Sequence, residues 1–324
     1  MLRETSTMSI SVTPLRDDLA FGCRINGVNE ETLRDEAVRQ QIRDAFEQHG
    51  MIVFEGMDQS NTVQIELSKV FGPLKDHPVA AVDRPDPESM GGAIRVITDP
   101  EFCDIVEIDG TAYSNWLPWH FDHCYNNELM RGGVLRLLEM SENGGQTCFM
   151  DGIALYKAMA PKIRDRLEDL SIIYSMDMQP AHIRFGRPEN FRVLQVHPAQ
   201  LEMLEQHKTF PRAIHPAVWT RASGEKVLHL SPWGAQGIEG LETPEGDRLF
   251  EEVCQTLLAK IRPYFHSWSP DEMIIWDNWR MLHSASGVAP DQHRLMHRTT
   301  IKGDYGLGCF EHGGQGSELL EMTV

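Results

Sequence analysis

Hydrophobic residues recur at helical spacing between residues 29 and 50. Acidic residues fill the first turn of this stretch and Gly50 ends it, which agrees with the helix dipole and with C-cap preferences. The apolar positions are Leu33, Val38, Ile42 and Phe46. The pattern predicts an amphipathic helix whose apolar stripe packs against a core.

Shorter apolar runs lie on both sides of this helix. The run at 51–57, M-I-V-F-E-G-M, predicts a short buried strand. Residues 60–74 predict a second helix with Ser60 near its N-cap. Upstream, the segment 13–29 alternates apolar pieces with turn residues, which indicates short strands and turns.

Residues 75–117 are rich in proline, aspartate and glycine and show weak periodicity. We interpret them as a long excursion around one short strand. Long irregular segments within a compact domain often form lids or binding loops. We therefore expect this segment to be a lid or a substrate loop.

From residue 117 the pattern changes to short β-rich runs bounded by turn residues. These runs are 134–140, 146–152, 191–198, 226–232, 272–278 and 293–303. Helices are predicted at 152–170 and at 243–262, where T-P-E supplies an N-cap, an early proline and early acidity. Many short strands with a few packed helices predict a mainly β fold with flanking helices, either a sandwich or a jelly roll.

The composition is typical of a globular protein, with 324 residues, of which 41% are hydrophobic and 24% are charged. We expect a single domain over residues 1–324. No apolar run approaches the roughly 20 residues of a membrane-spanning helix. The N-terminal residues 1–18 lack the apolar region of a signal peptide. We therefore expect a cytoplasmic protein with no membrane partner.

Acidic residues outnumber basic ones by 48 to 30, so the net charge is −18. Such a chain is a poor candidate for binding nucleic acid. If its substrate is an anion, a local cluster of cations must reverse the repulsive field. The six cysteines are scattered without a C-x-x-C pair, which indicates reduced thiols rather than a zinc ribbon or a disulfide framework.

The stretch W-H-F-D-H-C-Y-N-N at 119–127 offers four possible metal ligands, His120, Asp122, His123 and Cys124. In an extended segment His120 and Asp122 share a face, while His123 points away. An imidazole and a carboxylate on one face are two thirds of a 2-His-1-carboxylate triad, which leaves open positions on a non-haem Fe(II). Cys124 shares that face, but a thiolate suits such a triad poorly, so we interpret it as pocket wall or packing.

The best candidate for a third ligand is His283, which follows the predicted strand 272–278 and precedes a turn. A structural histidine is the competing interpretation. Beyond the turn, Arg294 and Arg298 are four positions apart and share one face of a strand. Because guanidinium groups bind carboxylates in a bidentate manner, this pair can hold a dicarboxylate co-substrate and an anionic substrate. Two surface arginines on an edge strand are the alternative.

A Gly-Gly turn at residues 144–145 leads into a strand that carries Thr147. The Thr147 hydroxyl can hydrogen-bond a carboxylate, although the turn alone indicates only a hairpin. Taken together, the motifs resemble the Fe(II)/2-oxoglutarate-dependent dioxygenases of the taurine dioxygenase and 2,4-D dioxygenase (TauD/TfdA) family. The matching elements are H-F-D at 120–122, G-G-Q-T at 144–147, W-D-N-W-R-M-L-H at 276–283 and R-L-M-H-R at 294–298.

The spacing of these elements also matches the family pattern. His283 precedes Arg294 by 11 residues and Arg298 by 15, and Asp122 precedes Thr147 by 25. A looser resemblance extends from about residue 50 to about residue 304, which is most of the chain.

The resemblance implies a fold and an iron site. The family fold is a double-stranded β-helix, or cupin-like jelly roll, which agrees with the predicted strands. His120, Asp122 and His283 would ligate Fe(II), with 2-oxoglutarate and O2 as co-substrates. The implied reaction oxidises 2-oxoglutarate to succinate and CO2 and hydroxylates a small anionic carboxylate or sulfonate. Related halogenases lack the carboxylate ligand, so the presence of Asp122 favours hydroxylation, or a related C–H oxidation, over halogenation.

The resemblance also implies roles for residues outside the metal site. Arg294, with Thr147, would grip the distal carboxylate of 2-oxoglutarate. Arg298 would hold the acidic group of the substrate. Trp116 is a candidate for the wall of the substrate pocket, with core packing as the alternative.

The chain departs from the family at Trp279, because many close relatives have W-D-N-R where this chain has W-D-N-W-R. The N-W-R form is similar to the carnitine-pathway hydroxylases, so analogy does not identify the substrate. Two alternatives stay open: a desaturation or other biosynthetic oxidation at the same iron, and a jelly-roll protein that binds a metal and an organic acid without turnover. Family members often form dimers or tetramers, so we expect a homo-oligomer.

Overall fold

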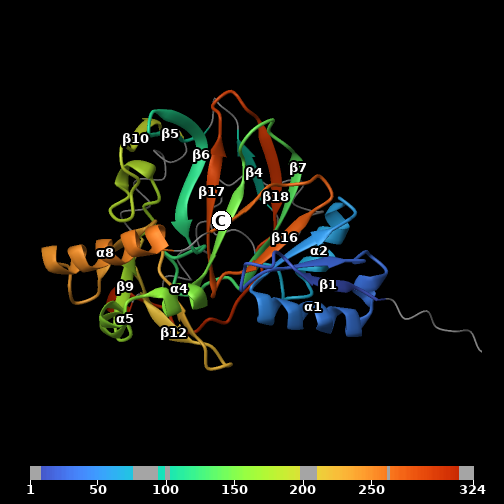
Figure 1. Cartoon of the computed structure of the whole chain (residues 1–324), viewed down its shortest axis with the longest axis horizontal. Helices are drawn as coiled ribbons and strands as arrows, with labels where there is room; N and C mark the ends of the chain where they lie inside the picture. The colour runs from blue at the N-terminus through green and yellow to red at the C-terminus, as the bar shows by residue number, and fades with distance from the viewer. Residues whose placement is uncertain (1–8, 76–93, 99–102, 198–209, 261–262, 314–324) are drawn as a thin grey trace, which may run out of the picture.

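Two large β-sheets form the centre of the structure, with helices on both sides (Figure 1). The structure is a computed structural model that describes residues 9–75, 94–98, 103–197, 210–260 and 263–313. Among the described residues, no helix combines the length and the apolar character that a membrane span requires. The predicted single domain over 1–324 stays a prediction.

The seven-stranded sheet joins strands from both ends of the chain. In order it contains β1 (Ser11–Pro14), β2 (Cys23–Asn26), β3 (Met51–Glu55), β16 (Met273–Asp277), β7 (Gly132–Glu139), β18 (Arg294–Arg298) and β4 (Ile94–Thr98). β2 and β3 are parallel, and the other described pairs are antiparallel. The strands predicted within 51–57, 134–140, 272–278 and 293–303 are confirmed.

The six-stranded sheet carries the region that follows the predicted excursion. In order it contains β10 (Arg192–Gln195), β5 (Ile105–Ile108), β6 (Thr111–His120), β17 (Met281–Val288), β8 (Thr147–Asp151) and β15 (Tyr264–His266). Its Phe149 and Met281 pack against Leu135, Trp276 and Met296 of the other sheet. Burial of these side chains holds the two sheets together as a sandwich.

Helices α1 (Glu36–His49) and α2 (Asn61–Ser68) cover the outer face of the seven-stranded sheet (Figure 1). The Asp35 carboxylate caps α1 by accepting from the Ala37 N–H, and the Ser60 hydroxyl caps α2 by accepting from the Val63 N–H. Both predicted helices are confirmed. Leu33 belongs to a separate 3-10 turn, η1 (Thr32–Arg34), because the Asp35 cap starts α1 after it.

A third layer packs beside the six-stranded sheet at the side where α8 lies in Figure 1. It contains a four-stranded sheet of β14 (Ala235–Ile238), β9 (Ser171–Tyr174), β11 (Ala213–Pro216) and β19 (Cys309–Phe310). The hairpin β12 (Val218–Thr220)–β13 (Lys226–Leu228), the helix α8 (Pro244–Lys260) and the 3-10 turns η2 (Pro180–His182) and η3 (Glu311–Gly313) complete it. The prediction of a helix at 243–262 is confirmed.

The prediction of one helix over 152–170 is wrong. The segment forms two short helices, α4 (Gly152–Ala158) and α5 (Pro161–Leu167). Pro161 disfavours a helical conformation at the residue before it, and both Met159 and Ala160 have extended ψ values, of 141° and 133°. Pro161 therefore begins a new helix instead of continuing the first.

The prediction of one short strand within 75–117 is also wrong. The described part of this segment contributes β4, β5 and most of β6. β4 pairs with β18 and β6 pairs with β17, so both strands support the interior of the sandwich. Partners more than 150 residues away complete these ladders, which local periodicity does not reveal. Residues 76–93 and 99–102, where a lid was expected, lie outside the described residues.

Candidate active site

Two neighbouring strands bring His120 and His283 together. His120 is the last residue of β6, and His283 lies opposite it on β17. Their ring centroids are 4.1 Å apart. A register shift between His283 and Ala285 marks a local irregularity at this point of the ladder. The best candidate for a third ligand thus lies directly beside the first.

Asp122 lies beside the two histidines, as predicted, but a turn carries it there. The predicted reason, alternation along an extended strand, is therefore wrong. β6 ends at His120, and residues 122–125 form a turn. The side chain of Asn278 clamps this turn: its oxygen accepts from the Asp122 N–H at 2.7 Å, and its amide donates to the Asp122 carbonyl at 3.1 Å. Asn278 therefore fixes the backbone from which the carboxylate projects.

His120, Asp122 and His283 form a compact, buried group. One ligand atom from each residue lies within 4.8 Å of the other two. The Nε2 atoms of His120 and His283 lie 3.9 and 3.5 Å from Oδ1 and Oδ2 of Asp122. The His120 Nδ1–H donates to the Pro118 carbonyl at 2.7 Å, which leaves the Nε2 lone pair of a neutral ring free for a metal.

The protonation states that the environment favours are those a metal requires. Burial lowers the pKa of both His120 and His283, so each ring stays neutral at pH 7. Burial acts to raise the pKa of Asp122, but the Arg298 guanidinium and the histidines outweigh it and hold that pKa well below its usual range. The group therefore presents two neutral imidazoles and one carboxylate anion.

The other two candidates from the W-H-F-D-H-C stretch are not in this group. His123 has a left-handed φ of 58° within the turn. Cys124 is fully buried, its Sγ donates to the Trp233 carbonyl at 3.6 Å, and burial raises the pKa of its thiol to about 12. Cys124 is therefore a packing residue, as the sequence indicated.

Arg298 projects from the opposite sheet into the metal-ligand group. Its Nη2 donates to Oδ2 of Asp122 at 2.6 Å, and its guanidinium lies 5.5 Å from the ring centroid of Trp276. Arg298 is mostly buried on β18, between β7 and β4. The alternative of a surface arginine on an edge strand is therefore wrong. The ion pair with Asp122 was not predicted.

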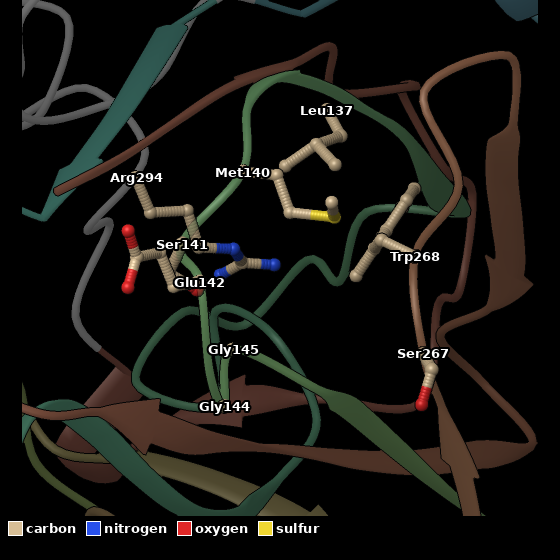
Figure 2. A pocket seen from close by; sticks show the side chains of 9 residues that line it. All are labelled: Leu137, Met140, Ser141, Glu142, Gly144, Gly145, Ser267, Trp268 and Arg294. Carbon is tan, nitrogen blue, oxygen red and sulfur yellow. The ribbon is translucent and has the colours of Figure 1, made fainter. Parts of the chain in front are cut away.

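Arg294 lies four residues before Arg298 on the same face of β18 and lines a pocket of about 190 Å³. Figure 2 shows its guanidinium pointing into the hollow, with Trp268 on the far wall. Among the described residues, Arg294 Nη2 has no hydrogen-bond partner. Burial lowers the pKa of Arg294 to about 10, which still leaves it charged at neutral pH.

The Gly-Gly turn forms one wall of this pocket (Figure 2). Gly145 has a left-handed φ of 70°, and a Cβ at this position would lie 3.1 Å from Cδ of Arg294. A side chain at position 145 would therefore be strained and would press on the arginine. Thr147 is buried two residues further on, and its Oγ1 accepts a hydrogen bond from the Trp268 Nε1–H at 3.1 Å.

An apolar cluster lies beside the histidines. Trp116 is half-buried on β6, four residues before His120, and its ring centroid is 5.5 Å from that of Phe191. Trp233 packs in the same cluster and meets the His120 ring edge-on at 4.9 Å. The structure thus places Trp116 in a wall that reaches the metal-ligand group.

Sequence reasoning missed Asn278, although it stands inside the W-D-N-W-R motif that the sequence singled out. Its side-chain amide also donates to the Met130 carbonyl at 3.2 Å. The backbone carbonyl of Asn278 faces Nε2 of His229 at 3.0 Å. The signal was present: an asparagine that directly follows a buried strand is a common backbone-bonding residue in turns.

Comparison with known proteins agrees with this geometry. The family model described as "Taurine catabolism dioxygenase TauD, TfdA family" matches residues 11–300. An (S)-phenoxypropionate/alpha-ketoglutarate-dioxygenase of Sphingobium herbicidovorans is 27% identical over 299 residues, 91% of this chain and 96% of its own length. An alpha-ketoglutarate-dependent 2,4-dichlorophenoxyacetate dioxygenase of Cupriavidus pinatubonensis is 26% identical over 306 residues, with 92% and 99% covered.

Solved structures show the same fold. A taurine dioxygenase from Burkholderia xenovorans superimposes with a TM-score of 0.69 at 20% identity, covering 98% of this chain and 99% of its own. The predicted jelly roll is confirmed by this likeness. With the family model matching most of the sequence, the chain belongs to the TauD/TfdA family of dioxygenases, oxidoreductases that use Fe(II) together with 2-oxoglutarate and O2.

Proposed function

We propose that this enzyme hydroxylates a small anionic organic substrate, a carboxylate or a sulfonate, as it converts 2-oxoglutarate to succinate and CO2. The observation that carries the proposal is the buried group of His120, Asp122 and His283, together with a buried arginine in a pocket, Arg294, whose Nη2 has no partner among the described residues. This arrangement suits a metal that needs open coordination positions. It also suits a dicarboxylate, which needs a cation as its partner.

His120, Asp122 and His283 would hold the Fe(II). The donor set fits this metal, because two imidazoles and one carboxylate on one side leave the remaining positions free. Bound Fe(II) supplies the site at which 2-oxoglutarate and O2 react and a substrate C–H bond is oxidised. The chain's own contribution is orientation: the Pro118 carbonyl fixes the His120 ring, and Asn278 fixes the turn of Asp122.

Arg294 and Thr147 would bind the distal carboxylate of 2-oxoglutarate. Arg294 is a buried cation whose Nη2 has no partner in the described part of the chain, and an unpaired buried donor is costly unless a ligand satisfies it. Thr147 begins β8 two residues after the pocket residue Gly145 and is bonded to the pocket residue Trp268, so its hydroxyl can donate to the same carboxylate. A dicarboxylate can then extend along the sheet from the metal toward Arg294.

Arg298 and Trp116 would bind the primary substrate. Arg298 uses Nη2 on Asp122, but its buried Nε has no partner among the described residues and can donate to an acid group. Trp116 belongs to the apolar wall that ends at Trp233 against His120. This combination supports an acid whose apolar body lies against the wall. The two relatives described above carry the names of aryloxy acids, which have such a form.

A substrate panel tests the proposal. Purified protein with Fe(II), 2-oxoglutarate and ascorbate is offered short carboxylates, sulfonates and aryloxy acids, and O2 uptake and succinate release are measured. We expect at least one acid to stimulate both and to gain a hydroxyl group. A product that has lost two hydrogens instead would indicate desaturation. Stimulation by neutral analogues but by no acid would contradict the anionic class.

The metal ligands are tested in the same assay. His120→Ala and His283→Ala should abolish substrate-dependent succinate release and weaken Mn(II) binding in calorimetry, because each removes a ligand. The matched control is His312→Ala, since His312 is exposed and does not belong to the group. Full turnover in either ligand variant would overturn the assignment.

A further inference from the structure

We propose that Trp268 is a positioning residue that directs the hydroxyl proton of Thr147 toward the distal carboxylate of 2-oxoglutarate. The inference rests on the proposed function, because it assumes that this carboxylate lies beside Arg294. It starts from one contact: the Trp268 Nε1–H donates to Thr147 Oγ1 at 3.1 Å, between two buried side chains.

The direction of this hydrogen bond determines what Thr147 can do. An indole N–H only donates, so Thr147 Oγ1 must accept, and its own O–H proton is left for another acceptor. A carboxylate only accepts. With Trp268 as its donor, Thr147 therefore suits an anionic ligand better than a ligand that donates.

The same tryptophan lines the pocket of Arg294 and Gly145 (Figure 2). Its ring is held firmly, because it packs in the core between the sheets and meets the His266 ring edge-on at 4.9 Å. Thr147 is bonded to one wall residue, Trp268, and is two residues from another, Gly145. A carboxylate beside Arg294 would thus meet one cation of the pocket and, from the residue bonded to the Trp268 wall, one hydroxyl donor that is already oriented.

Orientation before binding reduces the entropy that a ligand must overcome. If the Thr147 hydroxyl were free to rotate, it could donate elsewhere and would have to be redirected when the carboxylate arrives. The contribution of one such hydrogen bond corresponds to a change of about 2- to 10-fold in affinity. Trp268 should therefore affect affinity for the distal carboxylate and leave the metal-binding end unchanged.

Trp268→Phe tests this role, because it keeps an aromatic ring in the core and removes the N–H donor. Calorimetry on the Mn(II)-loaded protein compares 2-oxoglutarate with 2-oxobutyrate, which lacks the distal carboxylate. We expect the variant to bind 2-oxoglutarate about 5-fold more weakly and 2-oxobutyrate as wild type does. Trp219→Phe is the matched control, since its indole N–H donates to the Trp279 carbonyl instead.

Variants of Thr147 separate positioning from packing. In a Thr147→Val background, which has no hydroxyl, Trp268→Phe should cause no further loss for 2-oxoglutarate. Thr147→Ser, which keeps the hydroxyl, should retain sensitivity to Trp268→Phe. An equal loss in the Thr147→Val background, or an equal loss for 2-oxobutyrate, would overturn the positioning role and indicate packing alone.

The same titrations distinguish the two levels of the proposal. Wild type that binds both acids equally would overturn the placement of the distal carboxylate and, with it, the role of Trp268. Wild type that prefers 2-oxoglutarate, together with an unchanged affinity in Trp268→Phe, would overturn only the role of Trp268.

Discussion

Arg294 and Arg298 lie four residues apart on one strand, yet their surroundings differ. Arg298 is paired with the Asp122 carboxylate, whereas Arg294 Nη2 has no partner among the described residues. A paired arginine can hold a ligand only with its remaining donors, whereas an unpaired buried one is best stabilised by an incoming anion. The two arginines are therefore suited to two different acids.

Exchange of each arginine for glutamine should separate these roles. Arg294→Gln should weaken 2-oxoglutarate binding about 10- to 100-fold, because hydrogen bonds to charged groups contribute about 1.5–3 kcal/mol. Arg298→Gln should raise the KM of the acid found in the substrate panel much more than that of 2-oxoglutarate. Calorimetry with Mn(II)-loaded protein measures the first effect, and steady-state kinetics measures the second. The reverse outcome would mean that the two roles are exchanged.

Asn278 is a further residue whose contribution can be isolated. Asn278→Ala removes the hydrogen bonds that hold both backbone polar groups of Asp122, so the carboxylate should lose its fixed direction. Loss of such outer partners typically costs 10- to 100-fold in metal affinity, and we expect Mn(II) binding to weaken by about 10-fold. Asn190→Ala, which removes an exposed bond to Asp109, is the control. Unchanged Mn(II) affinity in Asn278→Ala would contradict this role.

At the scale of elements, local patterns predicted the strands and helices but not how they meet. His283, Arg294 and Arg298 lie on consecutive strands joined by one short connection, β17 and β18, and these positions were predicted. The ion pair between Arg298 and Asp122 joins residues 176 positions apart, one on β18 and the other in the turn after β6. No periodicity in the sequence encodes such a contact, because it arises from the packing of the sandwich.

The turn after β6 shows the same limit. Alternation along an extended strand correctly paired His120 with Asp122, but the strand ends at His120. Asn278, from the turn after β16, holds Asp122 in place. That His120, Asp122 and His283 form one group was thus predictable from the sequence, whereas the reason for their convergence required the structure.

Arg131 links the outer helix α1 to the strand β16. Its guanidinium lies 4.7 Å from the Phe46 ring centroid and 4.6 Å from that of Trp279, and it forms ion pairs with Asp277 and Glu47. Asp277 is almost fully buried, whereas Glu47 is exposed. Trp279, where the chain departs from the family motif, therefore has a structural role: its ring stacks against the Arg131 guanidinium in a cation–π contact.

Removal of this link should cost stability. Arg131→Met leaves the buried Asp277 without its cation, and breaking a buried pair on one side costs about 3 kcal/mol in the free energy of unfolding. Glu47→Gln removes only the exposed partner and should cost less than about 1 kcal/mol. Urea unfolding measures both variants. If both variants lost the same free energy of unfolding, the buried pair of Arg131 and Asp277 would not be the stabilising part of this link.

At the scale of the whole molecule, the net charge of −18 opposes any anionic substrate. The inner face of β18 offsets this charge locally with two cations, because Arg294 and Arg298 point into the sandwich on either side of Met296. The homo-oligomer, a dimer or a tetramer, and the cytoplasmic location expected from the sequence stay predictions. Light scattering on the purified protein measures the first.

Stability of the whole molecule should fall in mild acid because of two buried histidines. Burial lowers the pKa of His215 to about 4 and that of His229 to about 3. Above the ordinary histidine pKa of about 6.5, both rings are neutral in the folded and the unfolded chain and do not affect stability. Below it, the unfolded chain binds protons that the folded chain excludes, so unfolding becomes easier.

Each ring should therefore reduce the free energy of unfolding by about 1.4 kcal/mol per pH unit between pH 6.5 and its folded pKa. Urea unfolding of the metal-free protein at several pH values from 7 to 5 measures this slope. His215→Gln should lower this slope by the contribution of one histidine proton, whatever its effect on stability at pH 7. His312→Gln changes an exposed position and should leave the slope unchanged. The same dependence of unfolding free energy on pH in wild type and His215→Gln would contradict this prediction. It would mean that the folded protein accepts a proton at His215 and does not hold the buried ring neutral.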